Sequence, residues 1–473
     1  MAVSPTAMIA AAIGTLLLLS GCSEDLPPLV HRPAHAPAAI LIKTVDVFDA
    51  KAPRIDRNKD VLIRDGIIDS IADGGALIAP TDAEVIDGTG LTLLPGLIDA
   101  HAHLDSSPYP PWQLTLPNPD ANLQSLLYCG VTTILDPGES DAEAAVSRRK
   151  RVESGEQLGP QIFTAGRIIT ARGGHPVAMA KSLLPWWLAW YVVPRLAHEV
   201  DTDEGAREAA RVIHASGADV VKIVVDSAPE GTPRISTAQI AAAAEEASNL
   251  GLRTITHIGT FEDARDAASG GSSMWVHGVY KEPLDDGQVA ELAATGIPMT
   301  PTLEVFNSYS RTLDANRVAT ALESEIAPPG VLEALNDVPE DHPAIATFRP
   351  FIEMLARNRQ AGADNARRLF EAGVTMLAGS DPQAGVFAGA GLHRELALLS
   401  RAGIPNEHVL AAATINAARY LTRSPDPDFG IVAPGKRADL LLVEGDPVAD
   451  IANVSTIRAV ILRGEVLKRQ ARR

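Results

Sequence analysis

Cysteine is almost missing from this chain: Cys22 and Cys129 are its only two cysteines. A disulfide framework and a cysteine-based zinc finger are therefore excluded. Basic residues are also few, with 41 Lys and Arg against 59 Asp and Glu, and the formal net charge is −18. Nucleic acid is an unlikely partner of such an acidic chain, because phosphate binding needs a basic surface. Glycine-rich dinucleotide and phosphate-binding motifs are absent as well.

The sequence does contain enough apolar residues for a large core. It has 473 residues, of which 46% are hydrophobic. This length suits one large domain or two to three smaller ones. With cysteine excluded, any metal site has to use His, Asp, Glu or a modified Lys, and 12 histidines are available.

The first residues have the composition of an export signal. An apolar run from Ala7 to Leu19 precedes Leu19-Ser20-Gly21-Cys22, which resembles the lipobox of bacterial lipoproteins. We expect residues 1–21 to be a signal peptide, Cys22 to carry lipid, and the proline-containing residues 22–38 to be a tether. The protein is then predicted to be lipid-anchored to a bacterial membrane in the cell envelope. An ordinary signal peptide with an incidental Cys22 is one alternative. A second alternative is that these residues are not an export signal, because no Lys or Arg precedes the apolar run.

The rest of the chain has β-rich ends around an alternating centre. Short β-branched runs occupy residues 39–98 and 430–467. Between them, helix, glycine and strand recur, as in 203–225 and 237–258. Later strands are expected over 298–303 and 374–378. This repetition indicates βαβ units, and it favours a closed (β/α)8 TIM barrel over an open parallel sheet. Cys129 is expected to be a buried, unreactive thiol.

Polar side chains recur where the predicted strands end, at the edge where such folds place their functional residues. Each one alone has an ordinary structural explanation, but together they suggest a metal centre. Four histidines, one carboxylate and a lysine inside an apolar strand suit borderline divalent metals, zinc above all. The candidate residues are His101, His103, Lys222, His257, His277 and Asp381.

The ordered motifs around these residues resemble the amidohydrolase superfamily. The segments that carry the resemblance are 94–103 (LPGLIDAHAH), 130–133 (GVTT), 173–175 (GGH), 276–278 (VHG), 378–381 (AGSD), 412–418 (AATINAA) and 434–440 (PGKRADL). The resemblance covers about residues 39–467. The chain is most similar to the imidazolonepropionase-like and Xaa-Pro dipeptidase (prolidase) branch. This resemblance implies a barrel over 98–421 and a small β-sandwich from both chain ends, 39–97 plus 422–473.

The resemblance also implies roles for the candidate residues. His101, His103 and Asp381 are expected to bind one metal, and His257 and His277 a second. Lys222 is expected to be carboxylated and to bridge the two metals, which are predicted to be zinc. Asp381 is expected to carry a proton from the attacking water to the leaving nitrogen. His175 and Tyr280 are expected to contact the substrate, and Tyr280 to hold a terminal carboxylate.

The function predicted from these features is hydrolysis of an amide or peptide C–N bond. An Xaa-Pro dipeptidase or an N-acyl amino acid hydrolase is the most concrete version, with a small molecule or dipeptide as substrate. An imidazolonepropionase-like enzyme and a non-catalytic binding lipoprotein are the alternatives. Whether the chain forms a homo-oligomer is left open. The aromatic segment 185–191 (PWWLAWY) suits a lid, membrane contact or ordinary packing.

Overall fold

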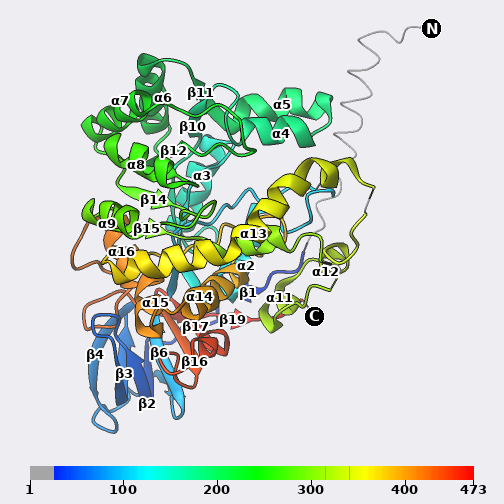
Figure 1. Ribbon diagram of the computed structural model, residues 1–473. Coiled ribbons are helices and arrows are strands. Elements are labelled where there is room, and N and C mark those ends of the chain that lie inside the picture. The colour runs from blue at the N-terminus through cyan, green and yellow to red at the C-terminus, as the bar shows by residue number, and fades with distance from the viewer. Residues whose placement is uncertain (1–25, 114, 315, 340, 473) are drawn as a thin grey trace.

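The computed structural model describes residues 26–113, 115–314, 316–339 and 341–472, and it has an α/β fold (Figure 1). The residues of the predicted signal peptide, Cys22 and the first part of the tether lie outside these ranges. Among the described helices, none is long and apolar enough to cross a membrane. Cys129 is buried, and burial raises the pKa of its thiol to about 12. Its predicted burial is therefore confirmed.

Strands from both ends of the chain form one sheet, seen at the bottom of Figure 1 in blue and in orange to red. Its hydrogen-bonded order is β18–β17–β16–β6–β2–β3–β4, and β5 pairs with β2. Antiparallel pairing of β6 with β16 places Leu440 opposite Pro95 and so joins the two ends. The strands are β2 Ala39–Phe48, β3 Ile55–Arg64, β4 Ile67–Asp73, β5 Ala83–Asp87, β6 Leu91–Pro95, β16 Leu440–Glu444, β17 Ile457–Leu462 and β18 Glu465–Val466.

The centre of the chain contains two parallel sheets. One has the order β11–β10–β12–β13–β14–β15, and the other has the order β7–β8–β9. The first comprises β10 Ile168–Ala171, β11 Ala197–Val200, β12 Val220–Val224, β13 Arg253–His257, β14 Met274–Val276 and β15 Met299–Thr300. The second comprises β7 Leu97–Asp99, β8 Val131–Asp136 and β9 Gln161–Thr164. Near-continuous burial of these strands is typical of parallel sheets covered on both faces.

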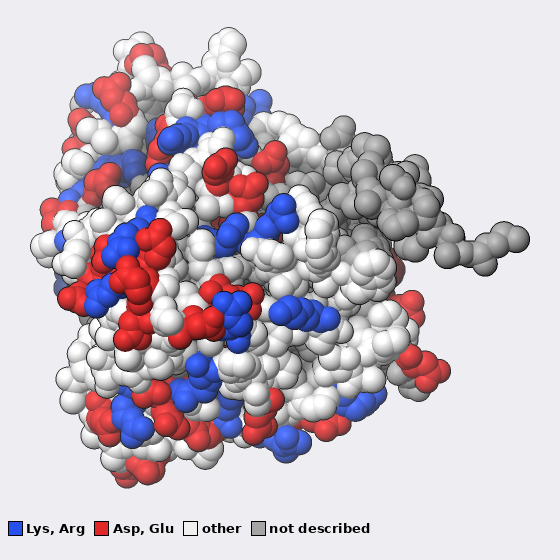
Figure 2. Space-filling view, turned by 90° about the horizontal axis from the view of Figure 1, so that it is seen from above, with Lys and Arg blue, Asp and Glu red and all other residues white. Residues whose placement is uncertain are grey.

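Helices follow these strands as the alternating pattern predicted. They include α6 Asp203–Ala215, α7 Thr237–Asn249, α8 Phe261–Ser269 and α9 Asp286–Ala294. Ser236, Thr260 and Asp285 begin three of them with capping boxes, which satisfy the first backbone N–H groups. The buried face of α7 consists of Ile240 and alanines, which allow close approach to the sheet. Figure 2 shows acidic and basic side chains mixed over one face of the molecule.

Backbone hydrogen bonds join the two parallel sheets. On one side, the N–H of Asp219 donates to the carbonyl of Thr164 at 2.7 Å. On the other, the segment 374–378 lies between β15 and β7, with Met299 donating to Thr375 and Ala100 donating to Ala378, each at 2.9 Å.

The two later strand predictions need correction. Residues 374–378 form only an isolated bridge, Met299 to Met376. The N–H of Ala378 donates to Ala412 instead of to a neighbouring strand, and this interrupts the ladder. The strand predicted over 298–303 is limited to β15, because the backbone of Thr302 is left-handed (φ 49°) and helix α10 (Leu303–Ser310) begins directly after it.

Candidate functional site

The predicted metal ligands meet at the carboxyl ends of the parallel strands. His101 and His103 follow β7, His257 ends β13, and His277 follows β14. Lys222 lies within β12, and Asp381 follows the segment 374–378. All six line one cavity of about 370 Å³, together with His175 and Tyr280. The structure thus brings together every candidate residue taken from the central part of the sequence.

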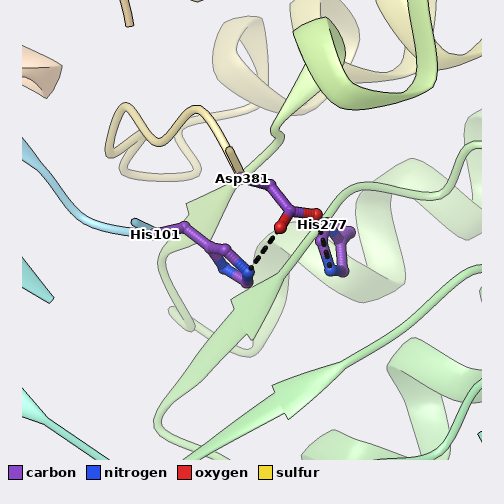
Figure 3. Close-up of side chains that lie close together, drawn as sticks. All are labelled: His101, His277 and Asp381. Atoms are coloured by element: carbon purple, nitrogen blue, oxygen red, sulfur yellow. Dashed lines mark ion pairs between the residues drawn. The ribbon is translucent and has the colours of Figure 1, made fainter. Parts of the chain in front are cut away.

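Asp381 is the centre of the ligand cluster, and Figure 3 shows it between His101 and His277. Its Oδ1 lies 3.6 Å from Nε2 of His101 and 3.5 Å from Nε2 of His103. Its Oδ2 lies 4.0 Å from Nε2 of His277. One ligand atom each from His101, His277 and Asp381 lies within 4.8 Å of the others. Such a group of buried nitrogen and oxygen atoms fits a divalent cation.

His257 and Lys222 extend this cluster. The ring centroid of His257 lies 4.1 Å from that of His277. Lys222 is only 3% exposed, and it faces the cavity from the middle of an apolar strand. The charge of Asp381 acts on Lys222, so the two side chains belong to one electrostatic group. The site therefore has a second set of candidate ligands beside the first.

Two of the four histidines have one ring nitrogen fixed by a hydrogen bond. Nδ1 of His103 lies 2.9 Å from the carbonyl of Gly138, and Nδ1 of His277 lies 2.5 Å from Oγ1 of Thr302. Metal-binding histidines commonly use one nitrogen in this way, which fixes the tautomer and the ring orientation. Nε2 of His257 lies 3.4 Å from a carboxylate oxygen of Asp226 but makes no hydrogen bond among the described residues. Neither ring nitrogen of the buried His101 has a hydrogen-bond partner among the described residues.

Burial sets the protonation of the site. It lowers the pKa of His257 to about 3 and moves the pKa values of His101 and His277 well below the ordinary range. These rings are therefore neutral at pH 7, as a metal ligand has to be. Burial also lowers the pKa of Lys222 to about 7. A substantial fraction of its amine is then neutral at pH 8 and has a free lone pair.

The backbone is unusual at the same place. His277, Thr302 and Asp381 all have left-handed conformations, with φ values of 67°, 49° and 51°. Residues other than glycine rarely adopt this region, and those that do cluster at functional sites. The strained residues here include two candidate ligands and the hydroxyl partner of one of them.

Two buried carboxylates at the site were not predicted from the sequence. Asp99 accepts hydrogen bonds from the backbone N–H of His101 and from the N–H and hydroxyl of Ser380, and so ties together two segments that carry ligands. Asp226 contacts His257, Tyr280 and Lys281. The sequence feature that could have identified Asp226 is its position, because it directly follows the apolar strand that contains Lys222.

The aromatic segment lies beside the cavity. Helices α4 (Val177–Leu183) and α5 (Trp186–Leu196) pack together, and Met179 and Leu196 line the cavity. Trp186 and Trp190 are 78% and 79% exposed and are not among the lining residues. These two side chains therefore do not form part of the cavity wall.

Residues 92–467, most of the chain, match the amidohydrolase family. The chain belongs to the amidohydrolase family. The assignment made from the sequence motifs is confirmed, and it supports the predicted enzyme class, a hydrolase of carbon–nitrogen bonds. Amidohydrolases generally bind divalent metals, which agrees with the ligand cluster around Asp381.

This amidohydrolase shares only short stretches with its curated relatives. A dihydroorotase of Ruminiclostridium cellulolyticum is 46% identical over 70 residues, and these cover 15% of each chain. An enamidase of Eubacterium barkeri is 33% identical over 90 residues, which cover 19% of this chain and 22% of the enamidase. The chain thus matches less than a quarter of the length of either relative.

Solved structures resemble the amidohydrolase over nearly its whole length. An Xaa-Pro dipeptidase with bound methionine has a TM-score of 0.71 and 24% identity, covering 90% of this chain and 99% of that one. A prolidase complexed with N-methylphosphonate-L-proline has a TM-score of 0.72 and 24% identity, covering 91% and 100%. The ochratoxinase of A. niger has a TM-score of 0.67 and 19% identity, covering 91% and 96%. At these identities the likeness shows a shared fold.

Proposed function

We propose that this chain hydrolyses an amide or peptide C–N bond in a small substrate, with two divalent metal ions held at the ends of its parallel strands. The observation behind this proposal is the convergence of four histidines, Lys222 and Asp381 on one cavity. These side chains come from strands and loops distributed between His101 and Asp381. Family membership supports the reaction class.

The ligand set fits two metals with the roles expected from the resemblance. His101, His103 and Asp381 would hold one ion, and His257 and His277 the other. The lone pairs that metals require are present, because burial keeps these imidazoles neutral. A mixed nitrogen and oxygen set with neutral imidazoles favours zinc.

Lys222 would bridge the two ions as a carbamate. Its neutral amine adds to carbon dioxide and loses one proton, which leaves a carboxylate with two oxygen ligands. Burial disfavours the ammonium form and thus makes the amine available. An unmodified ammonium has no lone pair and cannot bind a metal.

The chemistry divides between the metals and the chain. Bound zinc supplies a water of lowered pKa and polarises the carbonyl of the substrate. Asp381 takes a proton on its carboxylate and delivers it to the leaving nitrogen, which is a poor leaving group until it is protonated.

The finer architecture is also part of the proposal. We propose that residues 98–421 form a closed (β/α)8 barrel, and that 39–97 plus 422–473 form a sandwich domain. The hydrogen bonds that join the parallel sheets through Thr164 and through 374–378 support closure. The single sheet shared by both chain ends supports the second domain.

The proposed location is the bacterial cell envelope, with Cys22 as a lipid anchor. Only the lipobox-like sequence supports this proposal. Mass spectrometry of the N-terminal peptide from the native host tests it: a diacylated Cys22 is expected, and an intact Met1 contradicts it.

The substrate version expected from the sequence is an Xaa-Pro dipeptide or an N-acyl amino acid. Similarity of fold to an Xaa-Pro dipeptidase and a prolidase supports it. The same fold in an ochratoxinase shows that the fold leaves the substrate open.

Metal analysis of the purified chain, combined with a panel of small amides, tests the function. We expect two zinc ions per chain and measurable hydrolysis. Lys222→Ala should retain one ion and lower kcat/KM by about 1000-fold or more, because a bridging ligand and several kcal/mol of transition-state stabilisation are lost. Lys181→Ala, on α4, is the matched control and should keep both ions. Two ions in Lys222→Ala would contradict the carbamate bridge.

A further inference from the structure

His175, one of the two predicted substrate contacts, offers the cavity an acceptor rather than a donor. Its Nδ1 lies 2.8 Å from the carbonyl oxygen of Ala228. A carbonyl oxygen only accepts, so Nδ1 carries the hydrogen of the neutral ring and Nε2 has the lone pair. A substrate carboxylate only accepts hydrogen bonds, so Nε2 of His175 has no hydrogen to donate to it.

Tyr280, the other predicted contact, already uses its hydroxyl hydrogen. The hydroxyl donates to Oδ2 of Asp226 at 2.5 Å, and Asp226 is 1% exposed. Hydrogen bonds to an ionised carboxylate are about twice as strong as those between neutral groups. Tyr280 therefore keeps this partner and has no hydroxyl hydrogen left for a substrate carboxylate.

Lys281 is held by the same carboxylate. Its ammonium group donates to Asp226 and, at 2.8 Å, to the carbonyl of Ser227. It is not among the lining residues of the cavity. The ammonium group of Lys281 thus neutralises the charge of Asp226 and is not available to a ligand in the cavity.

Other donors of the cavity wall are committed in the same way. Ser106 donates to the carbonyl of His103, Ser140 donates to Asp105, and Tyr309 donates to Gln383. Gln383 donates one N–H to Asp381 and keeps a second, uncharged one. Among the described lining residues there is no arginine, and the one lysine is Lys222. As a bridging carbamate, Lys222 is held by the proposed metals and has no ammonium group to offer a ligand.

An aromatic wall completes the cavity. It consists of Tyr280, Phe306, Tyr309 and Phe351. Tyr280 and Phe306 stack with ring centroids 3.8 Å apart, and Tyr309 meets Phe351 edge to face at 5.9 Å. Ile168 and Val224 are among the aliphatic lining residues. Such a wall binds aromatic or branched apolar groups.

We infer that the substrates are uncharged hydrophobic amides, with an N–H or hydroxyl group that donates to Nε2 of His175 and an apolar group on the aromatic wall. This inference rests on the proposed amide hydrolysis and names its substrate class. It replaces the expectation that Tyr280 holds a terminal carboxylate, and with it the expectation that Xaa-Pro dipeptides and N-acyl amino acids, which carry a carboxylate, are the preferred substrates.

Two substrate pairs that differ only in a carboxylate test the inference. They are N-benzoylphenethylamine against N-benzoylphenylalanine, and N-benzoylisobutylamine against N-benzoylvaline, all of which keep the amide N–H. With the zinc-loaded chain at pH 8, kcat/KM is expected to be at least about 10-fold higher for the uncharged member of each pair, the cost of an unmatched carboxylate. Equal values, or a preference for the acids, overturn the inference and leave the hydrolase function standing.

Binding measurements distinguish a failure of this inference from a failure of the proposed hydrolysis. Calorimetric titration of the same four compounds is expected to show tighter binding of the uncharged members. If they bind more tightly but none is cleaved, the cavity preference holds and the proposed hydrolysis fails. If the acids bind as tightly or more tightly, the inference fails on binding alone.

The variant Tyr280→Phe gives a second test that does not depend on absolute activity. Its hydroxyl donates to Asp226 and not to the substrate, so the ratio of kcat/KM within each pair should stay within about twofold. A tyrosine that binds the carboxylate would lower the value for the acid alone by about 10- to 100-fold. Tyr309→Phe is the matched control in the same wall. A selective loss for the acid in Tyr280→Phe overturns the inference.

Discussion

Asp226 lies directly behind His257, with its Oδ2 3.4 Å from Nε2 of the ring. This carboxylate favours the hydrogen on Nε2 and so leaves the lone pair of Nδ1 for a metal, although Nε2 makes no hydrogen bond among the described residues. Burial opposes ionisation of Asp226, but the nearby His257 ring and the charge of Lys281 outweigh it and hold the pKa of this carboxyl below its usual range. Asp226 thus positions one proposed metal ligand.

Asp226→Asn should therefore weaken metal binding. The amide keeps the shape of the side chain but loses the charge and places an N–H₂ group against three donors. We expect zinc affinity to fall by about 10- to 100-fold, as is usual for partners of metal-binding histidines. Competition with a chromophoric chelator measures this without any substrate.

Asp263→Asn is the matched control for Asp226→Asn. Asp263 is equally buried, caps α8 and pairs with Arg234, but it contacts no proposed ligand. Its variant should lose stability and keep zinc affinity. Equal losses of affinity in both variants would mean that Asp226 acts through general stability.

Gly259→Ala should disturb the same carboxylate from the other side. A Cβ atom at residue 259 would lie 2.7 Å from Oδ1 of Asp226, which is closer than real Cβ contacts allow. We expect a loss of about 1–3 kcal/mol in the free energy of unfolding, the usual cost of overpacking, and weaker zinc binding. At Gly278, beside His277, the nearest heavy atom would lie at 3.7 Å, so Gly278→Ala should have a smaller effect. Denaturant unfolding of both variants measures the difference, and equal losses contradict the steric argument.

Asp381→Asn should affect poor leaving groups most. Asparagine cannot carry the proton, so kcat for an alkyl amide should fall by about 100- to 10,000-fold at saturating zinc. A nitroanilide, whose leaving nitrogen needs less protonation, should lose less. The ratio of the two losses is the diagnostic quantity, and bound zinc is measured in the same samples. Equal losses at full metal occupancy would exclude Asp381 as the proton carrier.

Glu395→Gln should change the pH dependence of stability. Glu395 is buried and accepts the N–H of Glu304 at 2.7 Å, and burial raises its pKa from 4.5 to about 8. The folded state therefore binds this proton more tightly than the unfolded state, and stability is lost as the pH rises from 4.5 to 8. Glutamine cannot ionise. The free energy of unfolding of the variant, relative to the natural chain, should rise by about 1–3 kcal/mol between pH 5 and pH 9. A difference that does not vary with pH contradicts this.

The periodic part of the fold was predictable because its determinants are local. The helix and strand predicted within 203–225 and within 237–258 agree with the structure, since α6 and α7 each have a capping residue at the start and an apolar face. The strand over 374–378 was not predictable in the same way. Its residues have strand character, but the N–H of Ala378 bonds to Ala412, a partner that no local pattern specifies.

The sequence by itself determined the candidate ligands, because strand periodicity and family motifs place His101, His103, Lys222, His257, His277 and Asp381 at strand ends. Only the tertiary structure decided which hydrogen-bond donors of the cavity are available to a ligand. The hydrogen of Tyr280 goes to Asp226, 54 residues away in sequence, and that of His175 goes to Ala228, 53 residues away. Residue type reveals that a side chain is able to donate, but its partner depends on which strands become neighbours. Recognition of the substrate therefore depends on packing that no single segment encodes.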